Sequence, residues 1–154
     1  MQTLCAEAGV IYKLVPELPG LGISGVMRWF QKRPMILQSL LFKTNDHFWF
    51  TFFHEAKHVL QQRKKSIFLE SEKAEQSDEK REEAADHFAA ELLIPCDAFE
   101  HFVAESARFS PTSVKSFADS VGIHPGIVSG RLMREGYAHY SEPVAKLREK
   151  FAWR

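Results

Sequence analysis

Cysteine is scarce in this chain of 154 residues, which contains only Cys5 and Cys96. Two cysteines so far apart form neither a C-x-x-C pair nor a disulfide framework, so a reducing cytoplasm is the expected location. An apolar leader is also lacking, because Glu7 and Gly9 interrupt the N-terminal segment. No uninterrupted apolar run is long enough to cross a bilayer, and we expect no association with membranes.

The chain also lacks an excess of charge of either sign, since 20 basic residues balance 20 acidic ones. A net charge of zero gives no overall attraction to nucleic acid or to an anionic membrane. The hydrophobic content of 45% and the charged content of 26% are typical of a globular protein. Thirteen phenylalanines indicate an aromatic core within a chain long enough for one ordinary domain.

The clearest chemical pattern is His54-Glu55-Ala56-Lys57-His58, which has the form H-E-x-x-H. On a helix, the two histidines lie one turn apart on the same face and can bind one Zn²⁺ ion. Glu55 is then a candidate general base for a bound water, whose pKa zinc lowers to about 7. Taken alone, the pattern also fits a core helix that contains two hydrogen-bonded histidines.

The surroundings of the pattern favour a metal. We expect a helix over residues 46–62, with Asn45 or Asp46 capping its first turn. Residues 47–53 are too apolar for a surface helix, so the helix is predicted to be buried. Buried histidines and a buried carboxylate need partners, and a metal ion supplies them.

A third ligand is expected from residues 81–95, a second helix that stops at Pro95. Glu82 shares a helical stripe with small and apolar side chains, which indicates that it points inward. Glu83 shares its stripe with polar residues and is expected to face solvent. We therefore predict His54, His58 and Glu82 as metal ligands. Asp86 lies one turn beyond Glu82 and can accept the free ring N–H of a ligand histidine.

The remaining segments predict a small, mostly antiparallel sheet followed by helices. Strands are expected over residues 9–15, 23–30 with a bulge at Gly25, and 34–41, with a polar turn at 31–33. This sheet either covers the buried helix or offers an edge that pairs with an extended substrate. A short strand is expected at 66–70, a mobile polar loop at 71–80, and helices at 97–104, 114–121, 127–135 and 142–154.

Residues 112–135 have the spacing of a helix-turn-helix, in which Ser129, Arg131 and Arg134 would contact DNA. Positive charge in this segment is modest, so a plain helical hairpin packed on the rest of the chain is favoured over direct DNA binding. We expect a metallopeptidase core over residues 1–108 and a C-terminal helical segment over residues 109–154.

Five other histidines have no partner at ligand spacing. His47 is on the same stripe as His54 but about 10 Å away along the helix, too far to share its ion. We expect His47, His87, His101, His124 and His139 to be ordinary polar or partly buried residues.

Two stretches together resemble the ImmA/IrrE family of zinc metallopeptidases. They are residues 46–58, which contain H-E-x-x-H, and Glu82-x-x-Ala85-Asp86-x-Phe88-Ala89-x-x-Leu92-Leu93-Ile94-Pro95. Residues 122–132 also look like the region that follows the peptidase core in the branch fused to helix-turn-helix antitoxin regulators. The chain departs from the family pattern where Lys57 replaces a usual Gly, where Gln61-Gln62 replaces a segment with a further His, and where Asp86 replaces a common Asn.

The resemblance implies zinc held by His54, His58 and Glu82, with Glu55 as the catalytic base of a gluzincin-like endopeptidase. The implied substrate is a protein, such as a DNA-binding transcriptional repressor, an antitoxin or a toxin partner. Because the family's N-terminal helix-turn-helix is missing, the chain is either a fragment of such a regulator or a stand-alone peptidase-like protein.

The sequence thus predicts an α+β fold in which a small sheet packs on a zincin-like active-site helix and a second ligand helix, followed by a helical, helix-turn-helix-like segment. Two functions stay open. One is a zinc endopeptidase, and the other is a non-proteolytic metal-binding module of a toxin-antitoxin or transcriptional regulator.

Overall fold

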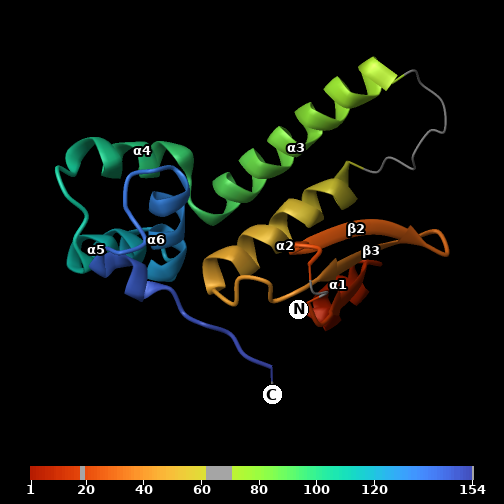
Figure 1. The fold of residues 1–154 in the computed structure, drawn as a ribbon, viewed down its shortest axis with the longest axis horizontal. Helices are drawn as coiled ribbons and strands as arrows, with labels where there is room; N and C mark the ends of the chain where they lie inside the picture. The colour runs from red at the N-terminus through yellow and green to blue at the C-terminus, as the bar shows by residue number, and fades with distance from the viewer. Residues whose placement is uncertain (18–19, 62–70, 154) are drawn as a thin grey trace. The chain divides into compact units, whose positions relative to one another are not determined.

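The computed structural model describes residues 1–17, 20–61 and 71–153. The elements are, in order, α1 (Gln2–Glu7), β1 (Ile11–Leu14), β2 (Gly25–Phe30), β3 (Arg33–Gln38), α2 (Asn45–Leu60), α3 (Ser71–Leu93), α4 (Cys96–Glu105), α5 (Pro111–Ser120), α6 (Pro125–Arg134) and the 3₁₀ helix η1 (Pro143–Leu147) (Figure 1). They confirm an α+β fold. Among the described helices, none combines the length and apolar character needed to cross a bilayer.

The chain forms two compact units. Unit 1 contains Met1–Leu41 and Thr51–Ala89, and unit 2 contains Phe42–Phe50 and Ala90–Arg154. Helices α2 and α3 each contribute residues to both units. The expected boundary near residue 108 stays a prediction.

The sheet of unit 1 is mixed rather than mostly antiparallel, which corrects the sequence prediction. Its strand order is β1-β3-β2, with β3 parallel to β1 and antiparallel to β2. Although β2 follows β1 in the sequence, it lies at the far edge of the sheet, and β3 then returns between the other two strands. Strand β2 is therefore an edge strand, and it runs below α2 in Figure 1.

A two-residue turn connects β2 to β3, as the polar residues at this point predict. Phe30 pairs with Arg33, and Gln31 and Lys32 both have positive φ angles, of 47° and 66°. Such turns match the twist of the flanking strands. The predicted bulge at Gly25 is absent, because Gly25 pairs in regular register with Gln38.

One face of the sheet packs against helices. Cys5, Tyr12 and Ile36 are buried there with Phe52 and Val59 of α2 around them. The rings of Tyr12 and Phe52 meet edge to face at 5.6 Å, and the Tyr12 hydroxyl donates to Gln38 at 3.0 Å. This packing fixes α2 on the sheet and so fixes the direction of its histidines.

Helix α3 is longer than the sequence predicts. Residues 71–80, expected to be a mobile loop, form its first turns. They contain Glu, Lys, Gln and Ala, which favour helices even without an apolar stripe. The predicted strand at 66–70 lies outside the described residues.

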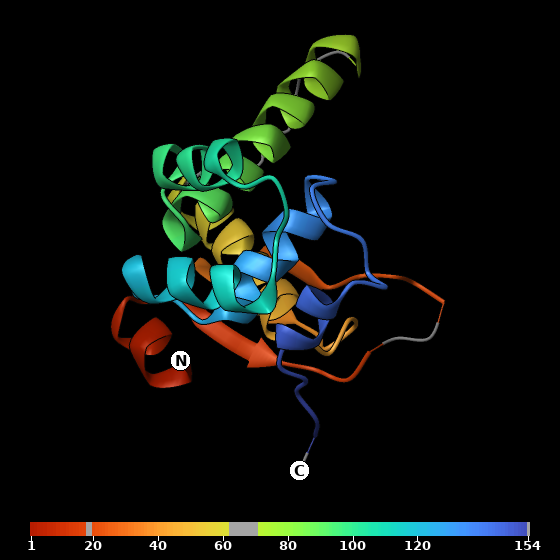
Figure 2. The same cartoon turned by 90° about the vertical axis from the view of Figure 1, so that its left-hand side faces the viewer.

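Unit 2 is helical, with α4, α5 and α6 grouped together in Figure 2. Its core consists of Ile94, Phe99, Val114, Ala118, Ile127, Val128, Leu132, Met133, Ala138 and Val144. Ser129 and Arg131, which the DNA-binding hypothesis requires at the surface, are buried at 0% and 9% exposure. Ser129 also donates to the carbonyl of Val144 at 2.6 Å. Two of the three residues that the hypothesis assigns to DNA contact are therefore buried inside unit 2.

The predicted helix over residues 142–154 is wrong. Among residues 142–153, which the structure describes, only η1 is helical, and the chain then runs extended beside residues 43–45. The N–H of Asn45 donates to the carbonyl of Glu149 at 2.9 Å, and that of Phe151 donates to the carbonyl of Lys43 at 2.7 Å. Backbone pairing with the start of α2 therefore replaces intrahelical hydrogen bonds.

Candidate metal centre

The two motif histidines lie on one face of α2. No Pro or Gly interrupts Asn45–Leu60, so the helix is continuous through His54 and His58. Their Nε2 atoms approach to 3.1 Å, and each side chain is 18% exposed. Two imidazole nitrogens aimed at the same point are suited to share one ion.

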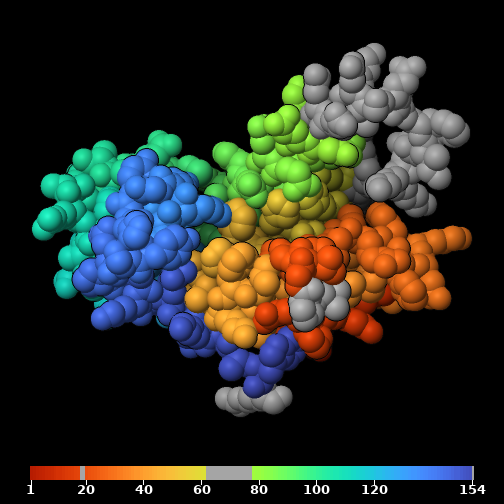
Figure 3. Space-filling view, in the orientation of Figure 1, coloured from red at the N-terminus to blue at the C-terminus, as the bar shows by residue number. Residues whose placement is uncertain are grey.

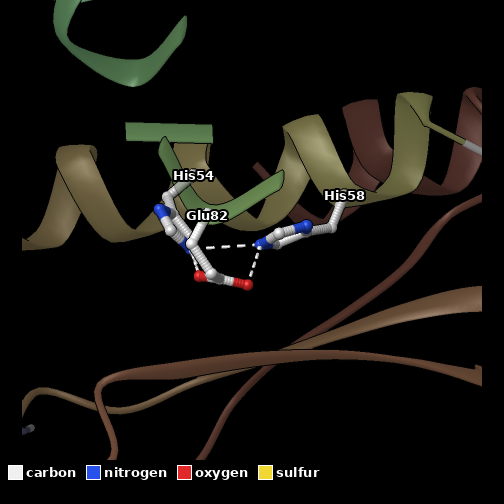
Figure 4. Close-up of side chains that lie close together, drawn as sticks. All are labelled: His54, His58 and Glu82. Carbon is white, nitrogen blue, oxygen red and sulfur yellow. Dashed lines mark hydrogen bonds and ion pairs between the residues drawn. The ribbon is translucent and has the colours of Figure 1, made fainter. Parts of the chain in front are cut away.

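Helix α3 brings two carboxylates to these histidines, and Figure 4 shows the one that belongs to Glu82. Glu82 Oε2 lies 3.1 Å from His54 Nε2, and Glu82 Oε1 lies 3.3 Å from His58 Nε2. Asp86 Oδ1 lies 2.8 Å from His54 Nδ1. The residues predicted as ligands and their predicted supporting carboxylate are thus together, all within unit 1.

The geometry of these atoms fits a tetrahedral ion. Zinc bonds of about 2.0–2.1 Å place neighbouring tetrahedral ligands about 3.3 Å apart. The three distances among His54 Nε2, His58 Nε2 and the Glu82 oxygens are 3.1, 3.1 and 3.3 Å. The contact from Asp86 to the opposite ring nitrogen of His54 leaves Nε2 available as a ligand atom.

Glu55 occupies the other side of the site, between α2 and strand β2. Its side chain is buried, and the backbone N–H of Met27 donates a hydrogen bond to its carboxylate. Burial raises the pKa of Glu55, while nearby His54 and the Met27 hydrogen bond oppose this rise. A carboxyl group with a raised pKa is better suited to accept and return a proton.

Gly25 makes this placement of Glu55 sterically feasible. A Cβ at Gly25 would lie 2.5 Å from Thr51 Cγ2, 3.0 Å from Glu55 Cγ and 3.1 Å from Glu55 Oε1. The sequence contained the signal, because glycine inside a strand marks either a bulge or a close approach. The close approach is what the structure shows.

A pocket of about 790 Å³ opens beside these residues. Its walls are Gly25, Val26, Met27, Arg28, Trp29, His54, Glu55, His58, Gln61, Arg81 and Glu82. The contribution of β2 as a pocket wall could not be predicted, since no pattern in the sequence indicates which strand lies at the sheet edge. The pocket can therefore receive a chain that lies along β2 next to the histidines.

Four of the five remaining histidines have other neighbours. The His47 ring stacks on Phe42 with centroids 4.2 Å apart, and His124 Nδ1 is 2.8 Å from the Asn45 amide nitrogen. His101 and His139 contact Glu105 and Ser141. Within the described part of the chain, His54, His58 and Glu82 are the one group with three potential ligand atoms that lie within 4.8 Å of one another.

Lys57, the departure from the family pattern, is engaged with α3. Its ammonium nitrogen lies 4.9 Å from the centroid of the Phe88 ring. A cation in this position is attracted by the ring face. Lys57 therefore adds a contact between the two helices that carry the candidate metal ligands.

Two histidines one turn apart and a carboxylate from a second helix form a donor set typical of zinc metallopeptidases, and the glutamate between the histidines is the position of the general base in that motif. The chain belongs to the ImmA/IrrE family: the model of the Peptidase M78 family, described as the IrrE N-terminal-like domain, matches residues 23–132, more than half of its length. Members of this peptidase family are typically metal-dependent. A comparison with curated proteins gave no significant match.

Proposed function

We propose that the protein is a zinc-dependent endopeptidase that acts on a protein substrate, such as a transcriptional repressor or an antitoxin partner. The observation that carries this proposal is the convergence of His54, His58 and Glu82 next to buried Glu55, at the wall of one pocket. These three residues would hold the ion, with Asp86 fixing the ring of His54.

The roles of the protein groups follow from their positions. When bound, zinc polarises the scissile carbonyl and acidifies water. Glu55 accepts the proton of the attacking water and returns it to the leaving amine. The outer edge of β2 pairs with an extended substrate segment through the backbone groups that Glu55 does not occupy, and so aligns the peptide bond with Glu55.

Metal binding is the first test. Purified wild-type protein, dialysed against buffer with trace zinc, is expected to retain close to one equivalent of zinc in elemental analysis. His54→Ala and Glu82→Gln should retain far less, and Glu83→Gln, on the exposed neighbour of Glu82, should match wild type. Full zinc retention by His54→Ala would contradict the assignment of the ligands.

Peptide cleavage is the second test. We expect the zinc-loaded protein to produce new termini in a proteome-derived peptide library, read by mass spectrometry. Glu55→Gln should lower the rate about 100-fold or more, the usual contribution of a general base, without loss of zinc. Equal cleavage by wild type and Glu55→Gln would show that a contaminating protease is responsible.

A second function is a metal-binding regulatory module that cleaves nothing. This function is favoured by the hydrogen bond that the Met27 N–H donates to the Glu55 carboxylate, because a carboxylate bound to the edge of β2 is less available to accept a proton from water. This function predicts stoichiometric zinc, no new termini from the library, and identical regulation of the partner by wild type and Glu55→Gln.

A further inference from the structure

The sheet of unit 1 has a second face, opposite α2. Gly25, whose absent side chain makes room for Thr51 and Glu55, assigns alternate residues of β2 to the α2 side. The register places Arg28 beside Met35 and Ile11, and Val26 beside Leu37 and Lys13, on the other side. We call this the open face, and its residues are Ile11, Lys13, Val26, Arg28, Phe30, Arg33, Met35 and Leu37.

The open face is apolar and accessible. Val26 and Phe30 are 42% and 45% exposed, whereas Ile36 on the covered side is 2% exposed. The side chains on a solvent-exposed face of a sheet are normally polar, and a pair of parallel strands is normally covered on both faces. Here β1 and β3 are parallel, and the open face has apolar residues in every strand. This composition is typical of a surface that a partner covers.

The charge of the open face has one sign. Strands β1, β2 and β3 contain Lys13, Arg28 and Arg33 and no acidic residue. All three basic side chains are exposed, and within the described part of the chain none of them forms an ion pair. Lys32 adds a further positive charge at the tip of the β2–β3 hairpin, which projects from the sheet in Figure 3. A complementary partner must carry carboxylates around an apolar centre.

The width of the sheet limits the size of this partner. Three strands spaced about 4.8 Å apart place the outer strands about 10 Å from each other. An α-helix with its side chains is about 10–12 Å across, so one helix spans the open face. A globular domain would need a considerably larger surface.

We propose that the open face docks one amphipathic helix of a partner protein, whose apolar stripe covers Val26, Phe30 and Leu37 and whose flanking carboxylates meet Lys13, Arg28 and Arg33. The interaction uses the side of the sheet opposite the metal centre, and it does not depend on whether the protein cleaves peptides.

The test uses the full chain and a synthetic 18-residue helical peptide with leucines along one stripe and glutamates at its flanks. A second peptide has lysines in place of the glutamates. We expect the glutamate peptide to shift backbone amide signals of β1, β2 and β3 in NMR spectra, with at least tenfold tighter binding than the lysine peptide and weaker binding at high salt. Equal binding of both peptides, or binding elsewhere, would overturn the proposal.

Matched variants separate the open face from general charge and apolarity. Lys13→Glu with Arg28→Glu should weaken binding at least tenfold, whereas Lys115→Glu with Lys146→Glu, the same charge change in unit 2, should not. Phe30→Ser should also weaken binding tenfold, and Leu92→Ser, at a residue 53% exposed on α3, should not.

Other occupants give different results. If the protein forms dimers on its own and Phe30→Ser abolishes them, the open face binds a second copy of the chain. If single-stranded DNA or anionic vesicles protect the amides of β1, β2 and β3 and the peptide does not, the open face binds those ligands. Either outcome overturns the proposal. Because the two peptides are compared on the wild-type protein, the test remains decisive even if a variant fails to fold.

Discussion

Gly25 controls how closely strand β2 and helix α2 approach one another. A methyl group at this position would meet Thr51 Cγ2 at 2.5 Å and the side chain of Glu55 at 3.0 Å. We expect Gly25→Ala to lower the free energy of unfolding by about 1–3 kcal/mol, because overpacking displaces the neighbours. Urea denaturation measures this loss.

Thr51→Ser provides the matching control, since it removes the methyl group nearest to the new Cβ. In the Gly25→Ala background it should restore part of the lost stability, while in the wild type it should be neutral or slightly destabilising. An absence of coupling between the two substitutions would show that the clash is relieved elsewhere.

At the residue scale, helical phase selected Glu82 rather than Glu83 as a metal ligand, and that role stays a prediction; the Glu82 side chain is 60% exposed although it faces the histidines. Glu82 and Glu83 are adjacent and chemically identical, yet only Glu82 was assigned inward, and it lies within 3.3 Å of both histidines. The same method could not identify Met27, because its contribution is a backbone N–H that carries no side-chain signal.

At the scale of elements, Arg131 ties α6 to the junction between α3 and α4. Its guanidinium donates to the carbonyl of Ile94 at 2.8 Å and to Glu135 at 2.7 Å, and it lies 4.1 Å from the centroid of the Phe99 ring. We expect Arg131→Ala to destabilise the protein by about 3 kcal/mol in urea denaturation, because it leaves the carbonyl of buried Ile94 without its donor and removes the packing on Phe99.

Arg131→Lys tests whether the planar guanidinium group is needed for stability, since a lysine cannot make both hydrogen bonds and also stack on Phe99. We expect it to recover less than half of the loss. Lys115→Ala, at an exposed position of α5, should stay within about 0.5 kcal/mol of wild type. A similar loss in this control would mean that the unit tolerates no surface change.

The two elements that were predicted wrongly show where local patterns fail. Residues 71–80 lack an apolar stripe, but their intrinsic helix propensity extends α3 to Ser71. Residues 148–151 were expected to continue a helix, but distant backbone partners at residues 43–45 pair with them instead. Helical periodicity reports only on residues that are close in sequence, so it cannot predict backbone pairing between segments about a hundred residues apart.

At the scale of the whole molecule, the proposed ion should couple metal binding to folding, because its ligands come from two helices that meet only in the folded protein. Saturating zinc at about 1,000 times the dissociation constant should raise the free energy of unfolding by about 4 kcal/mol. Calorimetry with zinc and with a chelator measures this difference. It should vanish in His54→Ala and persist in Glu83→Gln.

The sequence predicted the fold class and the pairing of the two motif helices, but not the order of strands. Strand order depends on which edge of the sheet β2 occupies, and the sequence pattern of the strands is compatible with either edge. The sequence therefore did not predict that β2 lies beside Glu55 and forms one wall of the pocket.

The hydrogen bond between Met27 and Glu55 has a consequence for the solubility of the protein. An edge strand with free backbone donors is a template for pairing between molecules, and here a carboxylate occupies one of those donors. Glu55→Ala would release it and is expected to favour aggregation through β2. Glu55→Gln keeps an acceptor oxygen in the same place, so it is the better variant for trapping an uncleaved substrate at high protein concentration.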